Sequence, residues 1–206
     1  AIIKSEPPKL SNFFGSLQYP WFIYSLKNPQ DYLVTLLMKK NRELNKLAYI
    51  DLHTGLPNRS RIEEVLAEHK DDDHSKAMII FDLNDLKEVN DSLGHIAGDT
   101  LIMNFAHIIR TYIPKKHFVG RYGGDEFIAL LSEITEDEIK EMITNILDET
   151  KRFNDFSKQI RIEFAYGYAF SNSIQGTDLK LLFKEADRKM YECKARMKEE
   201  KQVSSF

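Results

Sequence analysis

Gly123-Gly124-Asp125-Glu126-Phe127 is the stretch that decides the fold of this 206-residue chain. It lies between two short runs rich in residues that favour β-strands, His117 to Tyr122 and Phe127 to Leu131. A glycine pair supplies the positive φ that tight hairpins need, so the sequence predicts a hairpin with carboxylates at its tip. Adjacent carboxylates repel unless a cation lies beside them, and such hard oxygen ligands suit Mg²⁺. An ordinary solvated acidic turn is the alternative for this stretch alone.

A second acid, Asp82, follows the apolar run Met78 to Phe81. This run predicts a central strand over Ala77 to Leu83, buried on both faces. The polar end of such a strand has to be paired, capped or metal-bound. We expect Asp82 and Asp125, from two strands that meet in the sheet, to form a cradle for divalent ions. The alternative is that Asp82 caps a helix that begins at Asn84 or Asp85.

Two further segments carry dense polar sequence: Asp82 to Asp99, and Asp51-Leu52-His53-Thr54-Gly55-Leu56-Pro57-Asn58-Arg59 upstream of it. Together with the hairpin they resemble the GGDEF family, the diguanylate cyclases that condense two GTP molecules into cyclic di-GMP, and the motifs match in the family's order. The resemblance implies an α/β (α+β) fold of the nucleotidyl cyclase and polymerase-palm kind. Its core would be a central mixed, largely antiparallel five-stranded sheet flanked by helices, with an N-terminal helical linker.

The remaining elements follow from hydrophobic spacing. Amphipathic helices are predicted over Thr100 to Ile113, about Glu136 to Phe153 and about Asp178 to Lys198, with a strand over Ile160 to Phe170. This order favours a sheet flanked by helices. Asp31 to Ile50 has leucines at heptad positions, which predicts a helix. Because it stands directly before Asp51, this helix resembles the family's signalling linker. The leucine stripe of this helix would pack either against the same helix of a second protomer, in a dimer, or against its own domain.

The chain is 42% hydrophobic and 30% charged, which suffices for one well-buried domain plus an appendage. We expect an N-terminal segment and linker helix at 1–50, the cyclase domain at 51–200 and a tail at 201–206. Since the chain opens at Ala1 without a methionine, we expect an upstream sensor or regulatory domain. The present chain would then be the cytoplasmic part of a larger sensor protein.

Composition excludes several classes of partner. The net charge of −3 does not predict general nucleic-acid binding, which needs a strongly basic face. The single cysteine, Cys193, excludes an internal disulfide and is consistent with a reducing compartment, the cytoplasm. No run reaches the roughly 20 apolar residues of a membrane span.

Joining GTP to GTP requires a ribose 3′-hydroxyl to attack the α-phosphorus of the second nucleotide while pyrophosphate leaves. Such a step depends mostly on positioning and charge neutralisation, for which two metal ions about 3.5 to 4 Å apart are suited. The resemblance implies two Mg²⁺ per site, with Mn²⁺ as the alternative, held by Asp82, the Leu83 carbonyl, Asp125 and Glu126. The last two are also the expected catalytic acids, with their division of labour left open. One domain holds one GTP, so we expect catalysis by a homodimer.

The resemblance assigns guanine recognition to Asn90 and Asp99, with His95 close to the nucleotide. Guanine presents donor and acceptor edges, which call for a carboxylate and an amide placed together. Read without the resemblance, Asn90 and Asp99 would more often be turn or N-cap residues around Gly94 and Gly98.

Phosphate charge needs cations. Lys87 matches the family's lysine that stabilises the transition state, and Lys194 and Lys198, at i and i+4 on the last helix, match positions that hold the triphosphate. Lysine-rich helix ends are otherwise simply solvated. The family commonly has arginine at Lys198, so triphosphate binding could be weaker here. Arg121, just before the glycines, is a further phosphate candidate.

The chain also departs from the family pattern. Pro114 to His117 lacks the arginine and aspartate of the family's product-inhibition site, so we expect feedback by cyclic di-GMP there to be absent or weak. His53 replaces a common leucine, and the sequence gives no physical account of it. The alternatives to an active cyclase are a catalytically silent GTP-binding regulatory module and a dimerisation module.

Overall fold

The structure, a computed structural model, describes residues 29–68, 75–157, 159–171 and 178–203. Residues 1–28 of the expected N-terminal segment and the last three residues of the expected tail lie outside this set. The helices are α2 (Pro29–Tyr49), α3 (Arg59–Glu68), α4 (Leu86–Leu93), α5 (His95–Tyr112), α6 (Glu136–Phe156) and α7 (Leu179–Val203). The strands are β1 (Lys76–Leu83), β2 (Phe118–Arg121), β3 (Glu126–Ser132) and β4 (Phe164–Ser171).

The chain divides into two compact units, with the boundary after Asn45 inside α2. The predicted linker helix is confirmed as a helix. In the first unit, the Thr35 hydroxyl donates to the Asp31 carbonyl at 2.8 Å and Lys40 pairs with Glu43 at 2.8 Å. Heptad leucines of α2 are more than half exposed: Leu33, Leu37, Leu44 and Leu47. A dimer contact through this stripe stays a prediction.

The sheet of the second unit has the strand order β2-β3-β1-β4, and each neighbouring pair is antiparallel. The hairpin predicted around the glycines is β2 and β3, and the predicted central strand is β1. Among the described residues the sheet has four strands rather than the expected five and contains no parallel pair. The expectation of a mixed sheet came from the order of the predicted elements together with the family resemblance, and the antiparallel core sheet flanked by helices is confirmed.

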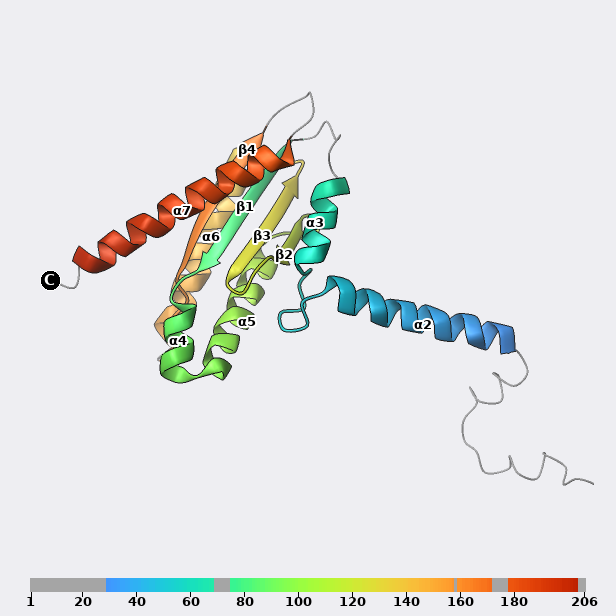
Figure 1. Ribbon diagram of the computed structural model, residues 1–206. Coiled ribbons are helices and arrows are strands. Elements are labelled where there is room, and N and C mark those ends of the chain that lie inside the picture. Colours follow the sequence, from blue (N-terminus) through green and yellow to red (C-terminus); the bar gives the residue numbers. More distant parts are fainter. Residues whose placement is uncertain (1–28, 69–74, 158, 172–177, 204–206) are drawn as a thin grey trace, which may run out of the picture. The chain divides into compact units, whose positions relative to one another are not determined.

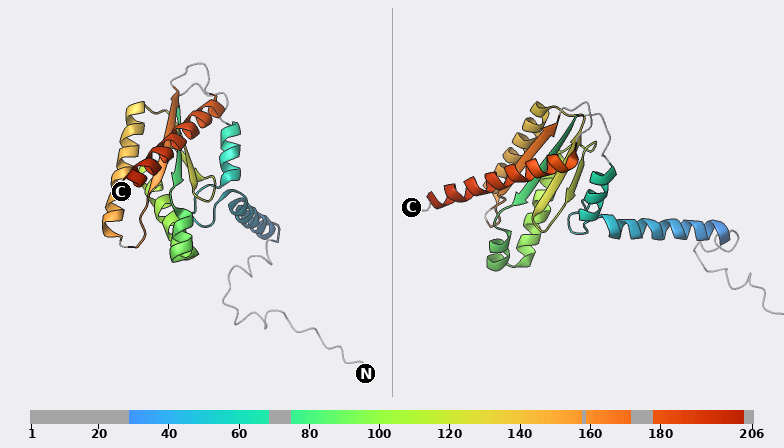
Figure 2. Two further views of the ribbon diagram at one scale, coloured as in Figure 1. Left: turned by 60° about the vertical axis from the view of Figure 1, so that its left-hand side comes forward. Right: turned by 45° about the horizontal axis from the view of Figure 1, so that its top comes forward.

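Helices cover both faces of this sheet, as Figures 1 and 2 show. Alternate residues of β1 point to opposite faces. Ile79 and Phe81 belong to a buried cluster with α5 and α6, whereas Met78 and Ile80 belong to a second cluster with α3 and α7. The same alternation assigns the even-numbered residues of β3 to the α7 side. Even-numbered polar residues that end these strands therefore face α7.

Helix α7 packs unusually close to β4 because of Gly167. A Cβ added at Gly167 would lie 2.2 Å from the Ala186 carbonyl oxygen and 2.2 Å from the Met190 nitrogen, both in the α7 backbone. Further along α7, Met197 Sδ accepts a hydrogen bond at 3.5 Å from Nδ2 of Asn84, in the loop between β1 and α4. The C-terminal half of α7 is thus placed beside the polar strand ends.

Candidate active site

Three acidic residues, Asp82, Asp125 and Glu126, lie where β1 ends and β3 begins. Asp82 and Glu126 are directly paired across the two strands, and the Leu83 amide donates to the Asp125 carbonyl at 2.9 Å. Strand alternation places the Asp82 and Glu126 side chains on the α7 face. The structure therefore brings together the acids that the sequence assigned to one cradle.

Lys194 of α7 contacts Asp82 from the α7 face of the sheet. Its Nζ lies 2.5 Å from Asp82 Oδ1, and the Asp82 side chain is only 8% exposed. Asp82 belongs to β1, and the residue that precedes α4 is Asp85, whose side chain makes no cap hydrogen bond. The alternative of Asp82 as a helix cap is thus excluded, and the carboxylate is instead neutralised by a lysine.

Burial and mutual repulsion disfavour the ionised forms of Asp82 and Glu126. Burial raises the pKa of Asp82 above its ordinary value, and this effect outweighs the opposing hydrogen bond from Lys194. Burial also raises the pKa of Glu126, and the charges of Asp125, Asp82 and Asp187 add to the shift. Asp187, on α7, was not singled out from the sequence. Buried, mutually repelling carboxylates of this kind are relieved by a bound cation.

The donor set fits a hard divalent cation that also binds substrate. Carboxylate and carbonyl oxygens are the ligands Mg²⁺ prefers, and this ion is often held by one or two carboxylates with phosphate oxygens completing its coordination. Within the described part of the chain, no three acidic, histidine or cysteine side chains stand close enough to hold an ion by themselves.

The turn that carries the acids differs from the tight hairpin turn expected. Neither Gly123 nor Gly124 is among the glycines with positive φ. Strand pairing ends at Arg121 opposite Phe127, and the amides of Tyr122 and Gly123 both donate to the Glu126 carbonyl, at 2.8 and 3.3 Å. A longer connection needs no left-handed residue. Gly123 instead leaves room for an acid, since a Cβ there would lie 3.0 Å from Glu126 Oε2.

Arg121 holds this turn rather than projecting toward a phosphate. Its Nε donates to the Gly123 carbonyl at 3.1 Å and its Nη2 to the Gly124 carbonyl at 2.7 Å. Its Nη1 lies 3.2 Å from both carboxylate oxygens of Asp51. The Arg121 side chain is only 14% exposed. We therefore revise the phosphate role expected for Arg121 to one of bracing the turn that carries Asp125.

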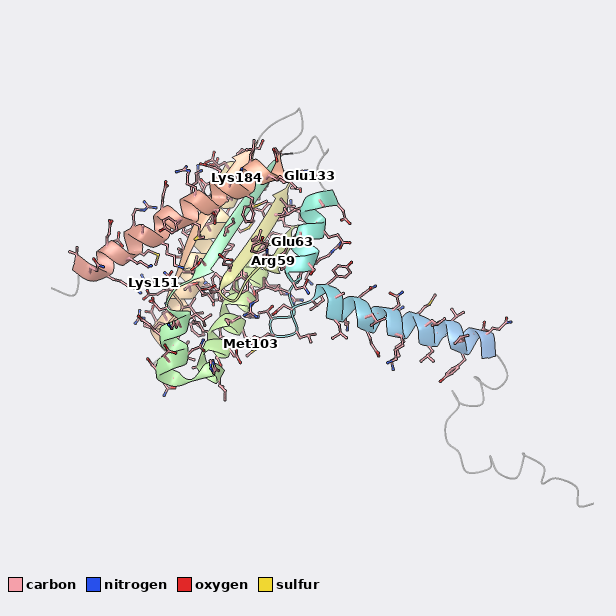
Figure 3. All side chains as sticks on the ribbon, viewed as in Figure 1. Arg59, Glu63, Met103, Glu133, Lys151 and Lys184 are labelled. Atoms are coloured by element: carbon pink, nitrogen blue, oxygen red, sulfur yellow. The ribbon has the colours of Figure 1, made fainter. Side chains whose placement is uncertain are left out.

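The segment that begins at Asp51 is tied to the same turn. Asp51 accepts hydrogen bonds from the Thr54 amide at 2.8 Å and the Thr54 hydroxyl at 2.7 Å. Burial opposes ionisation, but these bonds and the Arg121 charge outweigh it and lower the pKa of Asp51. Arg59, labelled at the start of α3 in Figure 3, stacks 4.7 Å above the Tyr122 ring. The upstream motif thus supports the hairpin from two sides.

The expected guanine-reading residues come together between α4 and α5. Gly94, with φ of 85°, joins the helices, and its amide donates to the Asn90 carbonyl at 2.9 Å. Asn90 lies directly against Gly98, where an added Cβ would be 2.1 Å from Asn90 Oδ1. Asp99 follows in α5 and is not its N-cap. Gly98 therefore serves the close approach of Asn90 and Gly94 the positive φ between the helices, and the N-cap role for Asp99 is excluded.

The other candidates sit around this group. Lys87 lies in the first turn of α4, and His95 begins α5; both are exposed. Lys198 lies one turn beyond Lys194 on α7, and its charge lowers the pKa of Asp82, although burial dominates that shift. His53 lies beside Asp99, with its Nε2 3.3 Å from the Asp99 carbonyl oxygen. This contact was not expected from the sequence.

The end of α7 anchors the loop between β1 and α4. Lys201 pairs with Asp85 at 2.5 Å and with Glu163 at 2.6 Å. Asp85 has a φ of 59°, a conformation that costs a non-glycine residue energy and therefore needs support. Helix α7 runs to Val203, so this lysine belongs to the helix and not to the separate tail expected from 201.

The family model described as "Diguanylate cyclase, GGDEF domain" matches residues 48–200 of this chain. The chain belongs to the GGDEF family. The site described above therefore lies in a GGDEF domain, and the hairpin acids are the residues that give the family its name.

Relatives and solved structures agree with this assignment. The signaling protein YkoW of Bacillus subtilis (strain 168) is 32% identical over 180 residues, covering 84% of this chain and 22% of YkoW. Diguanylate cyclase TpbB of Pseudomonas aeruginosa is 37% identical over 102 residues, covering 48% of this chain and 23% of TpbB. The GGDEF chain thus spans less than a quarter of either relative.

Among solved structures, the coiled coil and GGDEF domain of DgcB from Caulobacter crescentus, in complex with c-di-GMP, has a TM-score of 0.70. The match covers 84% of this chain and 94% of that chain at 21% identity, and it shows the shared fold. Among the described helices of the present GGDEF chain, none has the length and hydropathy needed to cross a membrane.

Proposed function

We propose that this GGDEF domain is a diguanylate cyclase that condenses two GTP molecules into cyclic di-GMP and releases two pyrophosphates. Each ribose 3′-hydroxyl would attack the α-phosphorus of the other GTP. A new phosphorus–oxygen bond forms, the bond to pyrophosphate breaks, and the hydroxyl proton leaves. Since one domain offers one nucleotide site, the reaction would take place between two facing protomers.

One observation carries this proposal: Asp82, Asp125 and Glu126 meet at neighbouring strand ends, beside a lysine from α7. Asp82, the Leu83 carbonyl, Asp125 and Glu126 would hold two Mg²⁺ ions, with Mn²⁺ as the alternative. When bound, the ions would supply activation of the hydroxyl and neutralisation of the leaving pyrophosphate. Two-metal chemistry needs such acids from more than one strand, and the domain has them.

The chain's own residues would do the rest. Asn90 and Asp99 would bind the guanine, with His95 nearby, and Lys194 and Lys198 would hold the triphosphate. Lys87 would stabilise charge that develops at the reacting phosphorus.

Asp125 and Glu126 would be the catalytic acids as well as metal ligands, and one of them would receive the 3′-hydroxyl proton.

The proposal is tested by incubating the purified chain with GTP and Mg²⁺ and resolving the products by chromatography. Cyclic di-GMP with two equivalents of pyrophosphate is the expected result. Asp125→Ala should abolish turnover while it leaves the fold intact by circular dichroism. Asp137→Ala, which removes a fully exposed acid on α6, is the matched control and should keep full activity. Retention of GTP without turnover would indicate the silent nucleotide-binding module instead.

The two-protomer arrangement has its own test. Activity per protomer should fall on dilution below the dissociation constant of the dimer. Activity per protomer that stays constant through that range would contradict catalysis between facing protomers.

A further inference from the structure

His53 is held in a rigid loop. The loop is fixed at one end by Asp51, whose carbonyl accepts from the Gly55 amide at 2.8 Å and whose amide donates to the Leu56 carbonyl at 2.8 Å. Leu56 is 3% exposed and packs in the core cluster. These contacts restrain the backbone on both sides of His53. The His53 side chain is only 32% exposed.

The imidazole of His53 points at Asp99. Its Nε2 lies 3.3 Å from the Asp99 carbonyl oxygen and 3.7 Å from Asp99 Oδ1. A carbonyl oxygen only accepts, so the shorter contact requires Nε2 to carry the proton. The Asp99 carboxylate oxygen, at 3.7 Å, lies beyond hydrogen-bond distance, so its contact with the imidazole is electrostatic. Leucine, the common residue at this position in the family, offers no donor.

The Asp99 carboxylate needs such a neighbour to be well oriented. Its side chain is 54% exposed, so packing does little to select one rotamer. Asn90, by contrast, is fixed against Gly98. A donor beside Asp99 favours the rotamers that keep the carboxylate near His53, and this reduces the entropy lost when a ligand binds.

We propose that His53 is a positioning residue for Asp99 and so contributes to the selection of guanine. This inference rests on the proposed function, in which Asp99 accepts from the N1 and N2 donors of guanine. Hypoxanthine lacks the 2-amino group and gains less from an oriented carboxylate. The preference for guanine over hypoxanthine therefore depends on His53.

The test uses the full chain with Mg²⁺ and 3′-deoxy-GTP or 3′-deoxy-ITP, which lack the attacking hydroxyl and report binding without turnover. His53→Leu should raise the Kd of 3′-deoxy-GTP by up to about 5-fold, the range expected for a partly exposed electrostatic contact. The Kd of 3′-deoxy-ITP should change less. His53→Gln, whose amide nitrogen can donate from a similar distance, should restore the preference for guanine.

Other outcomes decide against the inference. Equal weakening of both nucleotides by His53→Leu would show a general structural role, and unchanged binding would show no role at all. Failure of His53→Gln to restore the preference would also overturn it. If the wild type binds 3′-deoxy-GTP but makes no cyclic di-GMP, only the proposed cyclase activity fails. If the wild type binds neither nucleotide, both proposals fail.

Discussion

Gly98→Ala should weaken GTP binding without weakening the fold. The new Cβ would lie 2.1 Å from Asn90 Oδ1 and 2.8 Å from its Cγ, far inside van der Waals contact. Asn90 is a side chain that can rotate away, so the clash displaces it rather than the backbone. Displacement removes the expected amide contact with guanine. Leaving a polar partner unpaired costs about 1 to 3 kcal/mol, or roughly 5- to 150-fold in the Kd of GTP.

Folding stability should move in the opposite direction. Gly98 lies inside α5, where alanine is favoured over glycine by roughly 1 kcal/mol. The variant should therefore be as stable as the wild type or slightly more so in urea unfolding. Weaker binding together with undiminished stability would distinguish a local clash from general damage.

A double-mutant cycle makes the reasoning refutable. Isothermal titration with 3′-deoxy-GTP would compare the wild type, Gly98→Ala, Asn90→Ala and the double variant. Once Asn90 is truncated the clash has gone, so Gly98→Ala should have almost no further effect on binding. Additive losses in the cycle would refute the argument, because they would mean that Gly98 acts through something other than Asn90.

Three further predictions concern stability. Glu126→Gln should raise the melting temperature at neutral pH, because the fold raises the pKa of Glu126 and so destabilises its charged form. The gain should vanish when the pH falls below 4.5, the ordinary pKa of glutamate, because the carboxyl is then protonated in both the folded and the unfolded state. A gain that persists at that pH would contradict this cause. Gly167→Ala should destabilise the domain by about 1 to 3 kcal/mol or more in urea unfolding, because its Cβ meets the α7 backbone at 2.2 Å, and an unchanged midpoint would contradict the packing described. Lys201→Met should lower stability by less than about 1 kcal/mol, because the pairs it breaks with Asp85 and Glu163 are partly exposed. Lys184→Met, an exposed lysine on α7 labelled in Figure 3, is the control for the last change, and equal losses in both variants would argue against an anchor.

The sheet was largely predictable because its signals are local. The apolar run before Asp82 and the β-forming runs around Gly123 identified β1, β2 and β3 to within a few residues. Strand β4 was predicted from Ile160 but begins at Phe164. Ile162 has the right alternation, yet its amide and carbonyl are taken by the Asn154 side chain, at 2.7 and 2.8 Å. Side chains that compete for backbone groups leave no trace in hydrophobic periodicity.

The site was predictable to the extent that it depends on strand ends. Asp82 and Glu126 follow from pairing β1 with β3. The Lys194 contact follows only once α7 is known to cross that end of the sheet. The proximity of His53 to Asp99 spans 46 positions and depends on how a loop packs, so no local pattern could reveal it. The bracing role of Arg121 was missed for the same reason, since its partner Asp51 is 70 positions away.

Strand alternation also limits how this domain can change. Asp82 and Glu126 face α7 only because each stands an even number of steps from the core residues Met78 and Ile128. One residue inserted into or deleted from the middle of β1 would turn Asp82 toward the apolar core beside α5 and α6, and would place an apolar side chain where Asp82 now stands. Point substitutions can therefore change the site gradually, whereas length changes in this strand would remove an acid from it in a single step.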